Sequence, residues 1–135
     1  MKTTFKYIGF GLIGLILLFL FVANFSARET NFQCIGEISY EANTRPLTVY
    51  MRLTEYRPWV NLWNDSDGTI NLEAQAELRL FEYYGHIDQS GDLLHIYETY
   101  PNKALRGNFS KLSKKLAIDL GSPFGFFEGN CAVIN

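Results

Sequence analysis

The sequence predicts an all-β domain behind one long apolar helix. An uncharged apolar run covers residues 8–25 of the 135-residue chain. From Asn31 onward, apolar residues recur at every second position in short runs, which is typical of half-buried β-strands. Two cysteines, Cys34 and Cys131, lie near the two ends of this β region. We therefore expect an antiparallel up-and-down β-barrel of about eight strands, lipocalin-like in architecture, with a β-sandwich as the alternative.

The apolar run predicts a transmembrane anchor. As a helix, eighteen residues extend roughly 27 Å, which is close to the thickness of the hydrocarbon core of a bilayer. Lys2 and Lys6 precede the run, so the positive-inside rule places the amino end in the cytoplasm. No small-residue cleavage site follows, which favours a retained anchor over a cleaved signal peptide. The predicted organisation is a cytoplasmic end at 1–7, a transmembrane helix at 8–25, a linker at 26–30 and an exported β domain at 31–135.

The cysteines and the charge fit an exported domain. In an oxidising compartment, Cys34 and Cys131 are expected to form a disulfide that joins the first strand to the last. The alternative, a redox-active pair, lacks the C-x-x-C spacing that tunes thiol reactivity. Without Lys2 and Lys6, 10 basic residues stand against 14 acidic ones, a net charge of −4. Nucleic acid is excluded as a partner, since its binding requires Lys and Arg to displace counterions.

Turn residues separate the alternating runs. A turn is expected at 43–46, and Pro58 interrupts the pattern before a short strand from Trp59 to Trp63. Around Leu80 and Phe81 the alternation slips by one residue, which indicates either a β-bulge or a corner between two strands. Apolar residues occupy alternate positions in the successive runs as follows: Phe32, Cys34, Gly36, Ile38 and Tyr40; Leu47, Val49, Met51 and Leu53; Ile70, Leu72, Ala74, Ala76 and Leu78; Phe81, Tyr83, Gly85 and Ile87; Leu105, Gly107 and Phe109; Leu116, Ile118 and Leu120; Phe127, Gly129, Cys131 and Val133.

The last run mirrors the first, as expected for neighbouring strands that close a barrel. Closure removes the strand edges that otherwise invite pairing with other chains. The inward glycines of the runs, at 36, 85, 107 and 129, indicate either an internal cavity or tight bends.

His86 and His95 are the only two histidines of the chain. A two-residue loop at Ser90 and Gly91 would place them side by side on the outward face. Two neighbouring imidazoles can serve as a pH-sensing pair, because they repel each other once protonated. They can also bind a metal, although the sequence supplies no obvious third and fourth ligand. A plain surface position is the third interpretation.

One aromatic group has two possible roles. It consists of Tyr56, Trp59 and Trp63. They can line a pocket mouth or a protein interface, where aromatic residues are enriched, or they can pack in the core. No nucleophile elbow, phosphate-binding glycine loop or metal-ligand cluster occurs in the sequence. We therefore expect no enzyme activity, no cofactor and no metal.

Several short features together resemble the FidL-like family of enterobacterial inner-membrane proteins. They are one anchor helix, F-x-C at Phe32 and Cys34, S-D-G-x-I-x-L at 66–72, and G-x-C at Gly129 and Cys131. The layout is similar to ToxS and VtrC, which are periplasmic partners of ToxR-like transmembrane transcription regulators. The resemblance implies a single-pass protein of the bacterial inner membrane with a periplasmic barrel. It also implies an accessory sensor subunit whose barrel interior can take up a small apolar ligand.

Two other functions remain open. A stand-alone lipocalin-like protein would bind a fatty acid or a similar ligand in an open cavity. A periplasmic inhibitor or immunity protein would present a rigid loop, such as 56–63, to a hydrolase. Binding to a membrane-bound regulatory protein distinguishes the accessory sensor subunit from both of these functions.

Overall fold

The computed structural model describes residues 2–24, 27–57, 64–76, 79–98 and 104–134. Within these ranges the chain forms one helix and eight strands. They are α1 (Lys2–Asn24), β1 (Ala27–Tyr40), β2 (Asn43–Tyr56), β3 (Gly68–Ala76), β4 (Arg79–Ser90), β5 (Leu93–Glu98), β6 (Leu105–Ser110), β7 (Lys115–Asp119) and β8 (Phe126–Val133). β1 already begins at Ala27, inside the stretch predicted as a linker.

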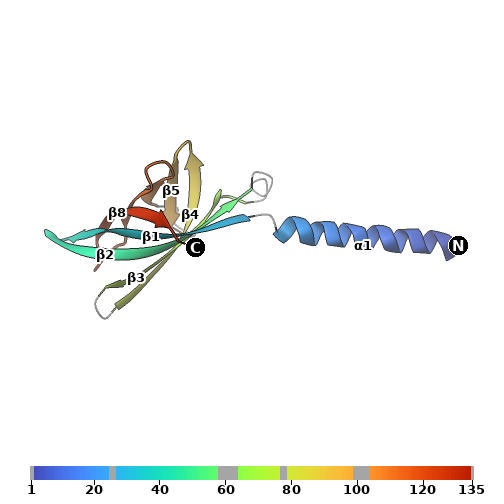
Figure 1. Ribbon diagram of the computed structural model, residues 1–135, viewed down its shortest axis with the longest axis horizontal. Coiled ribbons are helices and arrows are strands. Elements are labelled where there is room, and N and C mark those ends of the chain that lie inside the picture. Colours follow the sequence, from blue (N-terminus) through green and yellow to red (C-terminus); the bar gives the residue numbers. More distant parts are fainter. Residues whose placement is uncertain (1, 25–26, 58–63, 77–78, 99–103, 135) are drawn as a thin grey trace.

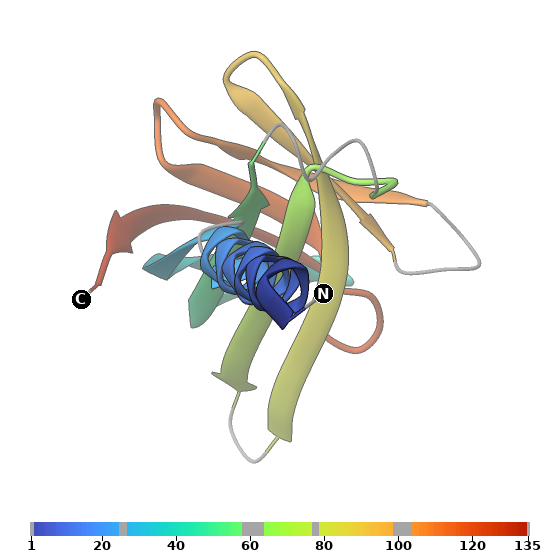
Figure 2. The same cartoon turned by 90° about the vertical axis from the view of Figure 1, so that its right-hand side faces the viewer.

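The strands form one closed antiparallel barrel in sequence order, and β8 pairs with β1. The predicted up-and-down barrel is confirmed, and the β-sandwich alternative is wrong because a single closed sheet surrounds the core. Figure 1 shows the barrel with α1 projecting from it. Figure 2, viewed from the helix side, shows hairpins β3–β4 and β4–β5 extending in opposite directions. The 12-residue strand β4 makes this possible, since its two halves belong to different hairpins.

The seam between β1 and β8 carries the disulfide. Cys34 and Cys131 are direct register partners, and their sulfur atoms are bonded at 2.00 Å. The predicted first-to-last disulfide is therefore confirmed. The next inward pair along the seam is Gly36 and Gly129. A Cβ atom on Gly36 would lie 2.1 Å from the carbonyl oxygen of Glu128, so these glycines serve close backbone approach.

Apolar side chains from the strands fill the barrel interior. An eight-stranded barrel has an interior just wide enough to be filled in this way. Phe32 and Phe109 pack against each other with ring centroids 5.2 Å apart. Among the described residues, the fully buried large side chains are Phe109, Phe127, Met51, Leu53, Ile70, Leu72, Ile87, Leu94, Ile96, Leu116, Ile118 and Val49.

The β1–β2 hairpin turns earlier than expected. Tyr40 pairs with Asn43, so the loop is Glu41 and Ala42, and the prediction of a turn at 43–46 is wrong. Both loop residues have positive φ, 47° and 68°, as a type I′ hairpin turn requires. Neither residue is the Asn or Gly that normally signals this turn. Pro46 is tolerated in β2 because the β2–β3 pairing extends only as far as Val49 on that side.

The slip in alternation near Phe81 is a corner between two strands. β3 ends at Ala76, which pairs with Arg79 at the start of β4. The inward residues are even-numbered in β3 and odd-numbered in β4, which produces the slip in alternation. They pair directly across the hairpin, as Ala74 does with Phe81. The corner interpretation is thus confirmed over the bulge. The short strand predicted from Trp59 to Trp63 lies outside the described residues.

The β4–β5 hairpin has a different register from the predicted one. Ser90 pairs with Leu93, so the loop is Gly91 and Asp92. Gly91 supplies the positive φ of 61° in this loop. The carboxylate of Asp92 accepts hydrogen bonds from Ser110 Oγ and from the backbone N–H of Leu112, both at 2.7 Å. These bonds from the β6–β7 loop stabilise the hairpin in this register.

The helix α1 leaves its apolar side chains uncovered. Its large hydrophobic residues between positions 7 and 21 are each 52% to 76% exposed. Within the described part of the chain, no helix meets the criteria of length and apolarity for crossing a membrane. The anchor at residues 8–25 stays a prediction.

Candidate functional site

A pocket of about 260 Å³ lies on the outer wall of the barrel. We call it the Tyr–Asp pocket. β2, the segment before β3, β4 and β5 each contribute to it. Its lining residues are Tyr56, Asn64, Asp65, Ser66, His86, Asp88 and Tyr97. Tyr56 is the register partner of Ala27, the first residue of β1, so the pocket lies at the barrel end to which α1 is joined.

Asp67 fixes the rim of the pocket through its backbone and its side chain. Its carbonyl oxygen accepts a hydrogen bond from the Tyr56 N–H at 2.8 Å, and its own N–H donates to the Ile87 carbonyl at 2.9 Å. Its carboxylate accepts from the Gln89 N–H at 2.7 Å. These three bonds join β2 and β4 around the segment that carries Asp65 and Ser66.

The pocket combines aromatic rings with unpaired negative charge. The carboxylates of Asp65 and Asp88 make no hydrogen bond or ion pair with any described residue, and none of the described lining residues is Lys or Arg. Tyr56 and Tyr97 add aromatic faces, which carry negative potential and attract cations. The pocket is therefore complementary to an organic cation, such as the side chain of Lys or Arg.

Of the two histidines, only His86 lines this pocket. It pairs across the sheet with Tyr97, and its Nδ1 lies 3.4 Å from Ser66 Oγ. The Ser66 hydroxyl also donates a hydrogen bond to the Gly68 carbonyl at 3.1 Å.

His95 lies elsewhere on the outer wall. It faces Asp88 across the β4–β5 ladder, and its Nδ1 lies 2.7 Å from the amide oxygen of Asn108. The prediction that His86 and His95 are directly opposite is wrong, because the loop is shifted by one residue. When the loop shifts by one residue, each residue of β4 pairs with a β5 residue two positions further along, so the side chains of both histidines still point outward. Their role as a pH-sensing pair stays a prediction.

The aromatic group from the sequence is only partly placed. Tyr56 lines the Tyr–Asp pocket, whereas Trp59 and Trp63 lie outside the described residues. Three further lining residues, Asp65, Asp88 and Tyr97, were not predicted as site residues. The close spacing of Asp65 and Asp67 before a glycine could have indicated a polar site in this segment. The residues that β4 and β5 add to the pocket depend on the hairpin register, which the sequence does not specify.

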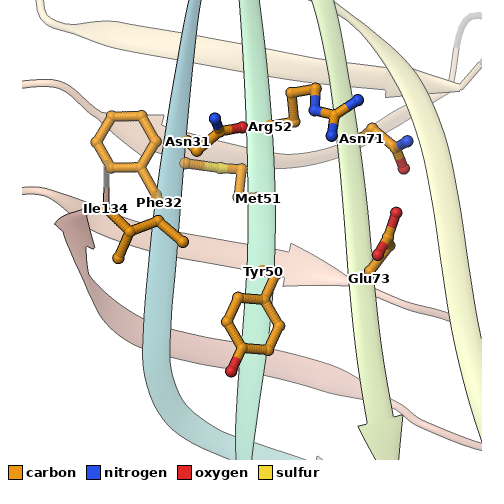
Figure 3. Close-up of a pocket in the computed structure, with 8 residues that line it drawn as sticks. All are labelled: Asn31, Phe32, Tyr50, Met51, Arg52, Asn71, Glu73 and Ile134. Atoms are coloured by element: carbon orange, nitrogen blue, oxygen red, sulfur yellow. The ribbon is translucent and has the colours of Figure 1, made fainter.

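A second hollow of about 310 Å³ crosses the outer wall over β1, β2 and β3. We call it the three-strand groove. Figure 3 shows its lining residues, which are Asn31, Phe32, Tyr50, Met51, Arg52, Asn71, Glu73 and Ile134. Asn31, Arg52 and Asn71 form one row of register partners, and Tyr50 and Glu73 are partners in the next row. No sequence motif marks this groove, because its residues come together only through strand pairing.

A polar cluster joins β4, β5 and β6. Arg106 is the extra residue where the β5–β6 register shifts, and its guanidinium pairs with Glu98. The hydrogen bond that the Arg106 guanidinium donates to the Glu98 carboxylate raises the pKa of Arg106. Burial raises the pKa of the Tyr83 phenol. The Tyr83 hydroxyl and the Arg106 Nε are buried, and neither has a hydrogen-bond partner among the described residues.

Neither a metal group nor a similar known protein identifies the site. Among the residues that the structure describes, no group of three or more His, Cys, Asp or Glu side chains is placed to hold a metal ion. No protein-family model matches the chain, and comparisons with curated proteins and with solved structures give no match. The likeness to FidL-like proteins stays a prediction based on short sequence features.

Proposed function

We propose that the protein is a membrane-tethered binding subunit whose periplasmic barrel docks onto a membrane-bound regulatory protein. The observation that carries the proposal is the Tyr–Asp pocket. It is lined by two tyrosines and by two carboxylates that make no hydrogen bond or ion pair with any described residue, and it lies at the barrel end joined to α1. Tyrosine and arginine dominate the energetics of protein interfaces, and a basic side chain of the partner would pair with Asp65 or Asp88. The same carboxylates disfavour contact with anionic lipid headgroups.

The tether is supported by the composition and exposure of α1. Residues 8–24 carry no charge, and the large side chains on every side of the helix are more than half exposed. A helix that is apolar all round requires a lipid or protein environment. No described helix is long and apolar enough to cross a membrane. Water is nevertheless a poor solvent for such an apolar surface.

The filled interior supports binding at the outer wall rather than inside the barrel. Phe109, Phe127 and Ile96 are 0% to 1% exposed and occupy space that an internal ligand would need. The likeness to FidL-like proteins suggests that the partner is a ToxR-like transcription regulator. The uptake of a small apolar ligand is a further part of that resemblance, and no contact described above favours it.

Photo-crosslinking in living cells tests the docking surface. A photoreactive phenylalanine in place of Tyr56 is expected to give one dominant adduct with a membrane protein. The same residue in place of Tyr40 is the matched control, since Tyr40 is an exposed aromatic residue at the opposite end of β1. Equal adducts at both positions, or none at position 56, would refute the docking surface.

Fractionation tests the tether separately. The full chain is expected to remain in the membrane pellet after washing with alkaline carbonate. Replacing Leu15 and Leu17 by Arg adds roughly 2.5–3.5 kcal/mol per residue to the cost of insertion and is expected to release the protein. Release of the unchanged chain by carbonate would show that α1 is not embedded in lipid.

A further inference from the structure

The geometry points to the three-strand groove as a binding site for a neutral oligosaccharide, independent of the Tyr–Asp pocket. Figure 3 shows the side chains that line this groove. Asn31, Arg52 and Asn71 lie side by side on three adjacent strands. Two strand spacings give this row a length of about 10 Å, which matches a disaccharide unit.

The groove presents both donors and acceptors that have no internal partner. The side-chain amides of Asn31 and Asn71, the carboxylate of Glu73 and the hydroxyl of Tyr50 make no hydrogen bond or ion pair with any described residue. Arg52 pairs with Glu29 through Nε at 3.1 Å, which leaves its two terminal nitrogens for a ligand. Sugar hydroxyls donate and accept at once, so neighbouring hydroxyls can satisfy amide, carboxylate and guanidinium groups together.

Tyr50 supplies the apolar part of such a site. It is 49% exposed on the outer wall, one row from the amides. The exposed face of an aromatic ring can pack against the C–H face of a pyranose ring. Tyr84, the register partner of Asn71, is 52% exposed and extends the same polar and aromatic surface to β4.

The charges disfavour other ligand classes. Glu73 and the nearby Glu29 repel an anion, while Arg52 repels a cation. The backbone groups of β1, β2 and β3 at the groove are already paired in the ladders, so an added peptide strand finds no free edge there. A neutral polyhydroxylated ligand meets none of these obstacles.

Glu73 also breaks a rule of sheet design. It faces Glu82 directly across the β3–β4 ladder, and like charges in that position are destabilising. This pair does not stabilise the fold, whereas the carboxylate of Glu73 could accept hydrogen bonds from a bound ligand. Violations of local preference without structural benefit concentrate at functional sites.

Saturation-transfer NMR on the full chain tests the proposal. The protein is held in dodecylphosphocholine micelles, because a glycoside detergent would compete. Chitotetraose and maltotetraose are the soluble probes, and retention on insoluble chitin or amylose, both neutral, is the polymer arm. We expect transfer from the protein to at least one tetrasaccharide, or retention on one of the two polymers. Transfer without retention assigns a free oligosaccharide as the ligand, and retention without transfer assigns the polymer.

Variants separate the groove from the rest of the surface. Tyr50→Ala combined with Asn71→Ala is expected to weaken binding at least tenfold. Tyr50→Phe keeps the ring but loses the hydroxyl, so it is expected to weaken binding less than the double variant does. Tyr40→Ala with Asn130→Ala removes the same side-chain types outside the groove and serves as the matched control. Absence of both transfer and retention, or binding that the groove variant leaves unchanged, overturns the proposal.

Discussion

The inner and outer walls of the barrel follow opposite rules. Inside, apolar side chains such as Phe109 and Ile96 are buried and packed, and no described polar or charged residue is fully buried. Outside, Asp65, Asp88 and Asn71 line hollows and have no partner within the described chain. Unused hydrogen-bonding capacity on the outer wall does not stabilise the fold. The difference indicates that stability depends on the inner wall, and the proposed binding sites lie on the outer wall.

The largest expected effect comes from emptying the interior. Phe109→Ala removes a ring that is 1% exposed, and the cavity left behind is expected to lower the free energy of unfolding by about 3–5 kcal/mol. Leu112→Ala is the control at an 85% exposed position, with an expected change within about 0.5 kcal/mol. Urea unfolding in micelles, followed by circular dichroism, measures both. Similar losses in the two variants would contradict the division between the walls.

Opening the seam is expected to have the next largest effect. Cys34→Ala with Cys131→Ala removes a crosslink across a sequence separation of 97 residues and is expected to cost about 2–5 kcal/mol. The reduced unchanged chain should lose a similar amount. Equal urea midpoints for the oxidised and reduced chain would show that strand pairing closes the barrel without help from the disulfide.

Tyr83 is the exception to the apolar inner wall, because it carries a buried hydroxyl. Removing this hydroxyl is expected to stabilise the protein. The hydroxyl is buried without a partner, so Tyr83→Phe should raise the free energy of unfolding by about 1 kcal/mol. Tyr84→Phe, at an exposed neighbouring position, should change little. A loss of stability in Tyr83→Phe would reveal a hydrogen bond to this hydroxyl in solution.

The same residue predicts a pH dependence. Burial raises the pKa of Tyr83 above its ordinary value of 10.0, so the unfolded chain loses this proton first as the pH rises. The stability contribution is therefore complete below pH 10.0 and is lost as the pH rises through the folded pKa. Unfolding at a series of alkaline pH values should show a smaller decline in Tyr83→Phe than in Tyr84→Phe.

The smallest effect on stability is expected at the Tyr–Asp pocket. Asp65→Asn with Asp88→Asn should change the free energy of unfolding by less than about 0.5 kcal/mol, since neither carboxylate has a partner to lose. The crosslink at position 56 should nevertheless disappear. Glu82→Gln removes an exposed carboxylate outside the pocket and should leave the crosslink intact. A crosslink that survives the Asp variants would show that the carboxylates are not part of the docking surface.

Much of the fold follows from local patterns in the sequence. Alternation along 31–40 and 126–133 indicated the strands that close the barrel, and the matching positions of Cys34 and Cys131 indicated the disulfide. Less of the candidate site could be predicted from the sequence. Tyr56 and His86 were singled out, but nothing in their local sequence placed them in one pocket with Tyr97.

Two errors show why the remainder could not be read from the pattern. The β1–β2 turn uses Glu41 and Ala42 at positive φ, although neither is a residue type that predicts such a turn. In the β4–β5 hairpin, the predicted and observed registers both keep Ile87 and Ile96 inward. Burial alone therefore could not choose between them.

The sequence by itself determined the apolar helix, the strands with one inward face, and the pairing of first and last strand, because these depend on residue type and on a period of two. Only the tertiary structure decided which outward residues become neighbours. A hairpin can shift its register by two positions without exposing any core residue, so the composition of the outer hollows depends on turn geometry and on contacts such as those of Asp67 and Asp92.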